Sequence, residues 1–196
     1  MAKHMTKNEL MRKLAMAKAQ KRVCEFSPEA AAALMAGYTM VHDEGFGAGR
    51  VVAVSNRIAE LQNALNSGEI DMEELRIRIF EKADFDVDYA RYGYEEITAK
   101  PGTVEYILEK YEIESRNIIT IRTAQYFICF YTALIDLYGY GKKRLNRVCE
   151  NVNELLRESD QRDGCVEEWQ KYITDKTGIE YENIFDAINR KYGKGE

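Results

Sequence analysis

The chain has 196 residues, of which 45% are hydrophobic, 31% are charged and only two are proline. This length and composition suffice for a packed core, and they exclude both a disulfide-framed miniprotein and a low-complexity chain. The net charge of −5 argues against a protein that coats nucleic acid over its whole surface.

The four cysteines form no Cys-x-x-Cys pair, and neither histidine lies at zinc-site spacing from them. We therefore expect reduced thiols, no metal site and no cofactor. The start of the chain has no apolar run, so we expect no signal peptide. The longest apolar stretch, Tyr126–Ile135, is too short to cross a bilayer, which favours a cytoplasmic protein without membrane contact.

Residues 1–27 are expected to form a basic helical arm. They hold seven basic and two acidic side chains, a net charge of +5, which leaves −10 for the rest of the chain. Thr6 and Glu9 have the spacing of a capping box that opens a helix. The basic side chains either form a solvated helix face or contact a polyanion or an acidic partner. The candidate contacts are Lys18, Lys21 and Arg22.

Residues 28–87, the first unit, are expected to form three helices. The first begins at Ser27 and Pro28, a capping residue followed by a residue suited to the first helical position, and ends near Asp43. The second, over residues 49–67, has apolar residues at three- and four-residue spacing and stops at a glycine.

The third helix of the first unit is predicted from a capping box at Asp71 and Glu74. Its expected apolar side comprises Leu75, Ile79 and Phe80. After it, the alternating pattern of residues 85–87 predicts either a very short strand or an extended link.

Residues 88–121 are expected to connect two units. A turn at residues 99–102 leads to Thr103, which is suited to cap a short helix that ends near Tyr111. Residues 122–196, the second unit with a last helix, are expected to begin with a helix over 122–137. That helix is apolar nearly all round and is therefore expected at the centre of the core. The next helix is expected to carry Leu145, Val148, Val152, Leu155 and Leu156, and further helices are expected over residues 166–177 and 183–192.

The two units resemble each other when the sequence is displaced by 94 residues. Residues 30–87 then lie on residues 124–181 without a gap, and both contain Gly-aromatic-Gly-x-x-Arg, at 45–50 and 139–144. Identity is low, but the ungapped register and the shared turn favour duplication over chance. We therefore predict an all-α fold, with at most one or two very short strands, in which a helical-hairpin unit occurs twice around a joint core.

The repeated segment resembles the turn of a helix–hairpin–helix, where backbone N–H groups beside a helix N-terminus hold a phosphate. The alternative is a structural turn, in which glycines reverse the chain, aromatic rings fill the hairpin and arginines bind carboxylates of the fold. The second turn carries more positive charge than the first. The candidate nucleic-acid or partner-binding residues are Gly139, Tyr140, Gly141, Lys142, Lys143, Arg144 and Arg147, together with Gly45, Phe46, Gly47 and Arg50.

Little in the sequence favours catalysis. His42 and Asp43 precede the first turn and could pair a base with a carboxylate, but the equivalent residues of the second unit are Asp136 and Leu137. The sequence shows no P-loop, Ser-His or Cys-His arrangement and no metal-ligand cluster. We expect no catalytic residues and hence a protein that is not an enzyme.

The stretches 42–47 and 137–147 resemble short accessory proteins of phages and prophages of low-GC Gram-positive bacteria, in which a similar acidic stretch leads to Gly-Phe-Gly-Lys-Lys-Arg-Leu. The likeness covers both units and fails at Ala48 and Gly49 of the first turn. It implies an inhibitor of a host defence complex, most specifically an anti-CRISPR protein whose partner is a Cas9-type nuclease. Guide RNA or duplex DNA backbone is a further expected contact. The alternatives are a DNA-binding replication or transcription accessory and a pure protein-interaction module.

Overall fold

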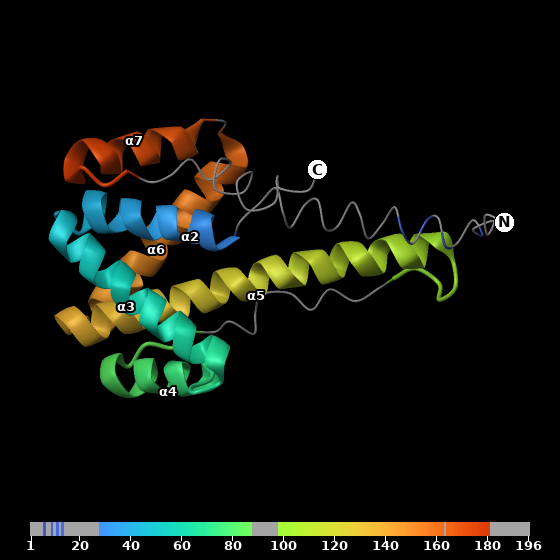
Figure 1. Cartoon of the computed structure of the whole chain (residues 1–196), viewed down its shortest axis with the longest axis horizontal. Coiled ribbons are helices and arrows are strands. Elements are labelled where there is room, and N and C mark those ends of the chain that lie inside the picture. Colours follow the sequence, from blue (N-terminus) through green and yellow to red (C-terminus); the bar gives the residue numbers. More distant parts are fainter. Residues whose placement is uncertain are drawn as a thin grey trace.

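The computed structural model describes residues 28–87, 98–162 and 164–180, together with the isolated residues 6, 9, 11 and 13. Every regular element of these residues is a helix, which confirms the predicted all-α class (Figure 1). The elements are α2 (Pro28–Tyr38), η1 (Thr39–Asp43), α3 (Ala48–Ser67), α4 (Met72–Ala83), α5 (Val104–Tyr138), α6 (Lys142–Gln161) and α7 (Cys165–Thr177). The helix predicted over 183–192 lies outside the described residues.

The first predicted helix covers its expected range, but its last turn is wound differently. Residues Thr39–Asp43 form a π-helical turn, in which the N–H of Glu44 donates to the carbonyl of Thr39 at 3.1 Å. A π-turn adds one residue per turn and so shifts which side chains face the core. Thr39, Met40 and Val41 are consequently all buried, and Glu44 is turned toward the second unit.

The capping box of α4 is present as predicted. The N–H of Glu74 donates to the Asp71 carboxylate at 2.8 Å, and the N–H of Asp71 donates to the Glu74 carboxylate at 2.8 Å. Leu75 and Ile79 are buried, but Phe80 is 54% exposed, so its assignment to the apolar side is wrong. Adjacent helical residues lie about 100° apart, and α4 rests on α5 by one narrow face. Residues 85–87 belong to no strand or helix, so the strand alternative is wrong.

The predicted break between a short helix ending near Tyr111 and a separate helix over 122–137 is wrong. One helix of 35 residues, α5, runs from Val104 to Tyr138, and the Thr103 hydroxyl caps it by accepting the Tyr106 N–H at 3.1 Å. The chain has neither glycine nor proline between Thr103 and Gly139, so nothing stops the helix. The expected boundary at residue 121 therefore falls inside a helix.

By length and composition α5 could cross a membrane, unlike the ten-residue stretch considered above. Of its most apolar 18-residue window, however, 56% is buried inside the fold. The C-terminal half of α5 includes Ile128, Phe130 and Leu134, whose side chains are fully buried. Core helices of globular proteins are commonly as long and as apolar as a membrane span. The packing of α2, α3 and α4 against α5 accounts for its apolar character.

The helices of the two units are interleaved around α5. In Figure 1, α3 and α4 of the first unit pack on α5, whereas α6 and α7 of the second unit pack on α2 and η1. Leu75 of α4 and Trp169 of α7, which match in the 94-residue displacement, are 2% and 3% exposed. Trp169 lies against Tyr38, with ring centroids 5.9 Å apart. One core cluster includes residues of both units, as expected for a joint core.

Helices α2 and α5 lie side by side and run in the same direction. Near the start of α2, Glu29 forms an ion pair with Arg122 at 3.5 Å. Beyond its end, the Phe46 ring contacts Tyr138 and Tyr140 at centroid distances of 5.1 and 6.5 Å. Residues between 29 and 46 therefore lie beside residues that are 92 to 94 positions later in the chain.

Candidate functional site

The two glycine turns have the same backbone geometry. Gly45 and Gly139 adopt the left-handed conformation, with φ of +64° and +62°. A Cβ atom at either position would meet nothing within 4 Å, so the backbone conformation, rather than lack of space, requires glycine. The N–H groups of Phe46 and Tyr140 then bond back to the carbonyls of Met40 and Leu134, at 2.8 and 3.4 Å.

Each turn ends at a helix whose N-cap residue is glycine. Gly47 precedes α3 and Gly141 precedes α6, both with extended backbone. A glycine supplies no side-chain acceptor, so neither helix has a side-chain cap, although the N–H groups of Arg50 and Arg144 each donate to the carbonyl of the capping glycine at 3.0 Å. Such a helix end is compatible with an anion, as the sequence pattern predicts.

The aromatic residues of the turns are part of the core. Phe46 is 3% exposed and Tyr140 is 1% exposed, and their rings meet edge to face. The structure therefore brings the two predicted turns together, although they are 94 residues apart in the sequence. It also shows that both rings fill the hairpins, as in the structural alternative, and neither can stack on a ligand.

Glu44 lies at the junction of the turns, and its side chain is only 2% exposed. Its carboxylate accepts the Tyr140 hydroxyl at 2.7 Å and the Arg147 guanidinium at 2.9 and 2.5 Å. Arg144 approaches the same carboxylate at 3.5 Å, and its guanidinium stacks on the Tyr140 ring at 3.6 Å. We call these four residues the Glu44 cluster.

The Glu44 cluster shifts the pKa of its members. Burial alone would raise the pKa of Glu44, but the bonds from Tyr140 and Arg147 and the charges of both arginines outweigh it and lower that pKa. Burial, and then the adjacent carboxylate, raises the pKa of Tyr140. The hydrogen bonds to Glu44 raise the pKa of Arg147. Glu44 is therefore ionised and Arg147 is charged near neutral pH.

The remaining cations of the turns differ in their partners. Lys142 forms an ion pair with Asp84 at 2.8 Å, and both side chains are more than half exposed. Arg50 is exposed and lies over the Phe46 ring at 5.3 Å. Lys143 is exposed and forms no ion pair with any residue that the structure describes. Lys143 and Arg50 are thus the turn cations most available to a partner.

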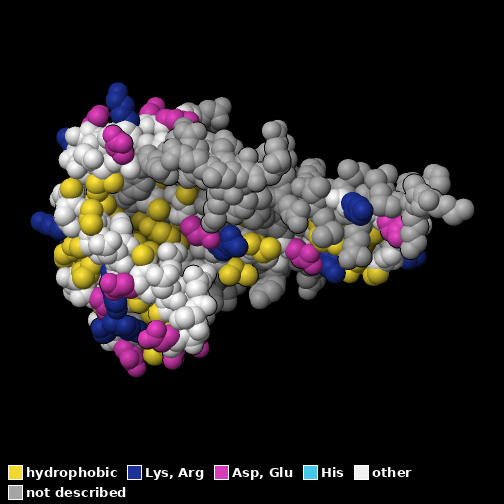
Figure 2. Space-filling view, viewed as in Figure 1, with side chains coloured by type: hydrophobic (Ala, Val, Ile, Leu, Met, Phe, Trp, Pro, Cys, Tyr) yellow, Lys and Arg dark blue, Asp and Glu magenta, His cyan; other side chains and the backbone are white. Residues whose placement is uncertain are grey.

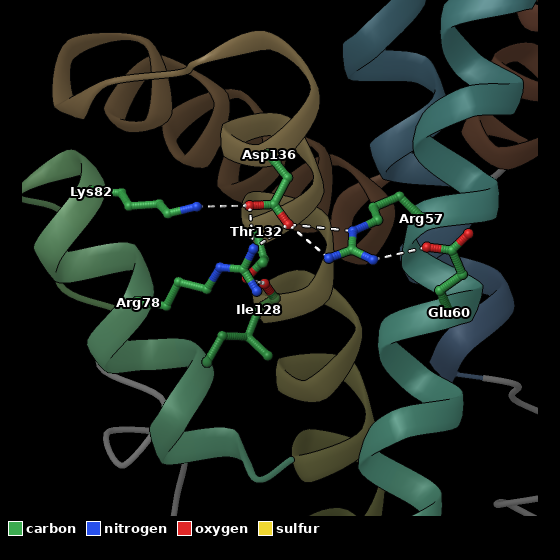
Figure 3. Close-up of polar contacts among 7 residues, drawn as sticks. All are labelled: Arg57, Glu60, Arg78, Lys82, Ile128, Thr132 and Asp136. Carbon is green, nitrogen blue, oxygen red and sulfur yellow. Dashed lines mark hydrogen bonds and ion pairs between the residues drawn. The ribbon is translucent and has the colours of Figure 1, made fainter. Parts of the chain in front are cut away.

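A second cluster, which the sequence reasoning missed, surrounds Asp136 of α5. Figure 3 shows Arg57 of α3 and both Arg78 and Lys82 of α4 converging on its carboxylate. The distances are 2.9, 2.7 and 3.2 Å, and the Asp136 side chain is 10% exposed. Arg57 also binds Glu60 at 2.8 Å. We call Asp136, Arg57, Arg78 and Lys82 the Asp136 cluster.

Burial alone would raise the pKa of Asp136, but hydrogen bonds from Arg57 and Lys82 and the charge of Arg78 lower it. One signal in the sequence pointed to this cluster. Asp136 is the single charged residue between Tyr126 and Tyr138, and a carboxylate in a helix predicted to be central requires a cation. Nothing in the sequence indicated which cations these are.

The other candidates do not join either cluster. Lys18, Lys21 and Arg22 lie outside the described residues. His42 bonds Asp43 at 2.6 Å and stacks on the Tyr38 ring at 4.9 Å. In the described parts of the chain no group of three His, Cys, Asp or Glu side chains could hold a metal.

Three cysteines are described, and all are free thiols. Cys129 and Cys165 are buried, and Cys149 is partly buried. Burial raises the pKa of Cys129 to about 12, so this thiol is protonated and unreactive at neutral pH. These cysteines behave as small apolar core residues.

Comparison with known proteins adds no relative to this description. No protein-family model, no curated protein and no solved structure matches the chain. The functional conclusion therefore depends on the geometry of the two clusters and the paired turns.

Proposed function

We propose that the paired glycine turns are the binding face of a non-enzymatic phage-type protein that inhibits a host nucleic-acid-targeting complex, most specifically a Cas9-type nuclease. One observation carries this proposal. Five cations stand at the turns, and they outnumber the two carboxylates, Glu44 and Asp84, that pair with them. The surplus positive charge lies beside two helix ends suited to anions.

The paired cations still present donors to solvent. Lys142, Arg144 and Arg147 have side chains that are 57%, 47% and 55% exposed, although each touches a carboxylate. A guanidinium has five N–H donors, and Arg147 gives Glu44 only two. Because the cluster fixes both arginines in place, a phosphate would find them already oriented, which reduces the entropy cost of binding.

The net charge of the protein favours an inhibitor over a protein that coats DNA. The chain carries a net charge of −5, although its second turn is basic. An acidic helical body can lie in the positively charged channel of a nuclease that holds guide and target strands, while the turns contact nucleic-acid backbone. Such contacts are sensitive to salt and carry little sequence specificity.

A second candidate is a pure protein-interaction module. The internal bonds of Arg144, Arg147 and Lys142 favour it, because these side chains already serve the fold. A DNA-binding accessory protein is the third candidate, and it uses the same cations without a nuclease partner.

We also propose that the two units arose by duplication. Helices α3 and α6 begin and end at residues displaced by 94 positions, and their preceding turns share one geometry. The interleaved packing, with α4 on α5 and α7 on α2, has the pattern expected of two fused copies related by a rotation.

The test is a pull-down with guide-loaded Cas9-type nuclease, run beside a duplex-DNA gel shift on the same sample. The informative variant is Arg50→Ala/Lys143→Ala, because it spares the Glu44 cluster. The matched control is Lys100→Ala/Lys171→Ala, which removes two exposed charges outside the turns. We expect the wild type and the control to capture the nuclease and the variant to capture less.

Each other outcome points to another candidate. A shift of duplex DNA without nuclease capture favours the DNA-binding accessory. Equal nuclease capture by wild type and variant would leave the inhibitor but remove the phosphate contact. If neither nuclease nor DNA binds, the proposal fails and the interaction module remains.

A further inference from the structure

A stack of rings lies just before the first glycine turn. The imidazole of His42 is parallel to the Tyr38 ring, with 12° between the ring planes and 4.9 Å between the centroids. Tyr172 of α7 lies beside both rings, at centroid distances of 5.3 Å from Tyr38 and 5.4 Å from His42. We call these three residues the His42 stack. The His42 side chain is 48% exposed, and within the described residues only Tyr38 stacks on it face to face, so the stack can be extended.

The equivalent position of the second unit is closed by charge. In the 94-residue displacement His42 corresponds to Asp136, and Tyr172 corresponds to Arg78. Asp136 is bound by three cations in Figure 3, and its side chain is only 10% exposed. Acidic and basic side chains also lie next to one another over α4 in Figure 2. At His42, rings take the place of the carboxylate and of one cation, and the position remains open where its counterpart is saturated.

The backbone that carries His42 is irregular. Thr39–Asp43 is a π-helical turn, whereas the equivalent residues 133–137 continue the α-helix of α5. The Oγ1 atom of Thr39 is buried and has no hydrogen-bond partner among the described residues, whereas the Thr132 hydroxyl bonds the carbonyl four residues earlier at 2.8 Å. An unpaired buried hydroxyl lowers stability, and π-turns are frequent at functional sites. This local cost at the His42 stack indicates a role beyond packing.

Charge around the His42 stack favours a ligand that carries phosphate. The Asp43 carboxylate is occupied by the imidazole Nδ1 atom at 2.6 Å, a bond that also fixes the orientation of the ring. Lys176 is exposed, and its Nζ atom lies 5.8 Å from the centroid of the Tyr172 ring. Arg147 is near as well, because Glu44 chiefly, and Asp43 to a smaller extent, raise its pKa. The stack therefore adjoins the glycine turns and has a cation of its own.

We propose that the open face of His42 stacks on an unpaired base of single-stranded nucleic acid, whose phosphates contact Lys176 and the glycine turns. This inference rests on the proposed backbone contact of the turns and names the form of nucleic acid that they bind. Every base has a flat π-face that extends a stack of parallel rings, and unpaired bases stack on aromatic and histidine side chains. Bases inside a duplex already stack on one another. A nuclease that separates its target strands exposes unpaired bases.

The test is a titration of the full-length protein with an oligothymidylate of about ten nucleotides that contains 2-aminopurine, whose fluorescence falls on stacking. An abasic oligomer of the same length keeps the phosphates and lacks the bases. We expect the wild type to quench the fluorescence and to bind the abasic oligomer about tenfold more weakly. His42→Ala should lose about tenfold in affinity for the base-containing oligomer, and His42→Phe should regain most of it, because a flat ring returns. Phe80→Ala removes another exposed ring, on α4, and as the matched control should bind like the wild type.

Three results would overturn the proposal. The first is that the wild type binds neither oligomer, or binds both equally. The second is that His42→Ala binds the base-containing oligomer like the wild type, and lower nuclease capture by that variant would then assign the stack to a protein partner. The third is an equal loss of affinity in Phe80→Ala and His42→Ala. The phosphate contact of the turns is tested separately by Arg50→Ala/Lys143→Ala, which should weaken binding of both oligomers by the same factor.

Discussion

The Glu44 cluster and the Asp136 cluster perform the same task in different surroundings. In each, a shielded carboxylate near the end of one unit's first helix binds cations that belong to the other unit. The cations of Asp136 lie on α3 and α4, away from the glycine turns, whereas those of Glu44 follow a glycine turn. The comparison shows that arginines beside a glycine turn need not mark a phosphate site, since they can bind a carboxylate of the same protein.

The clusters also differ in how much water reaches the cations. Arg57 and Arg78 are 28% and 38% exposed, whereas Arg144 and Arg147 are 47% and 55% exposed; Lys82, at 47%, is as exposed as Arg144. A cation that is half exposed regains water when its carboxylate is removed, and a desolvated one does so less easily. The predictions below use this difference, and they run from the largest expected effect to the smallest.

Lowering the pH should remove the stabilisation that both clusters give to the folded protein. The pKa values of Asp136 and Glu44 are lowered in the folded protein, so their stabilisation is present above the ordinary carboxyl pKa of about 4 and is lost as the pH falls through the folded values. We expect the free energy of unfolding in urea to fall steeply between about pH 5 and pH 2. Asp136→Asn/Glu44→Gln should show a shallower decline over the same range. An identical pH dependence of the two proteins would contradict this assignment.

Asp136→Ala should be the most destabilising single substitution in either cluster. It leaves three cations facing one another across α3 and α4, at a cost of about 3 kcal/mol in the free energy of unfolding. Urea unfolding at pH 7 measures it. Glu60→Ala is the control, because Glu60 is 66% exposed and its bond to Arg57 is worth about 0.5 kcal/mol. If the two variants are equally stable, the Asp136 cluster has no structural role.

Glu44→Ala should cost less, about 2 kcal/mol, because Arg144 and Arg147 can be rehydrated. The same change removes a negative charge beside both guanidinium groups, and we expect this to outweigh the loss of their fixed orientation and to increase nucleic-acid retention. A urea titration and a gel shift on one sample of the variant test both statements. Lower stability without greater retention would support the interaction module over the phosphate contact.

Tyr140→Phe should have a smaller effect, about 1 kcal/mol, because it removes one hydrogen bond to Glu44 and retains the buried ring under Arg144. Thermal unfolding of wild type and variant measures it. A shift equal to that of Glu44→Ala would mean that the hydroxyl, rather than the arginines, holds the carboxylate.

Gly45→Ala and Gly139→Ala should each cost about 1 kcal/mol, because both positions have positive φ. If the turns are equivalent, the two losses in a urea titration should agree within about 0.5 kcal/mol. A clear difference between them would weaken the case for duplication.

The local features of the fold could be predicted from the sequence because their causes are local. The capping box at Asp71 and the glycine stops at Gly45 and Gly139 depend on residues within one turn of each other. The continuity of α5 could not be predicted, because its surface changes from half-polar to apolar near residue 122 and such a change resembles a boundary between two helices. A change of environment along one helix leaves no breaker in the sequence.

The partners of the charged side chains could not be predicted. Asp136 is 58 residues from Arg78, and Glu44 is 103 residues from Arg147. Pairing at this distance depends on the interleaved packing of α4 on α5 and of α6 on η1, which no local pattern encodes. The candidate turns were placed correctly, but which of their cations remain available became visible only in the structure.

The most direct test is the salt dependence of binding to guide-loaded nuclease, measured for wild type and for Arg50→Ala/Lys143→Ala. If both side chains contact phosphates, the slope of log affinity against log salt should become shallower by about 2 in the variant. The Lys100→Ala/Lys171→Ala control should keep the wild-type slope. An unchanged slope in the Arg50→Ala/Lys143→Ala variant would contradict the proposal that the paired glycine turns contact a nucleic-acid backbone.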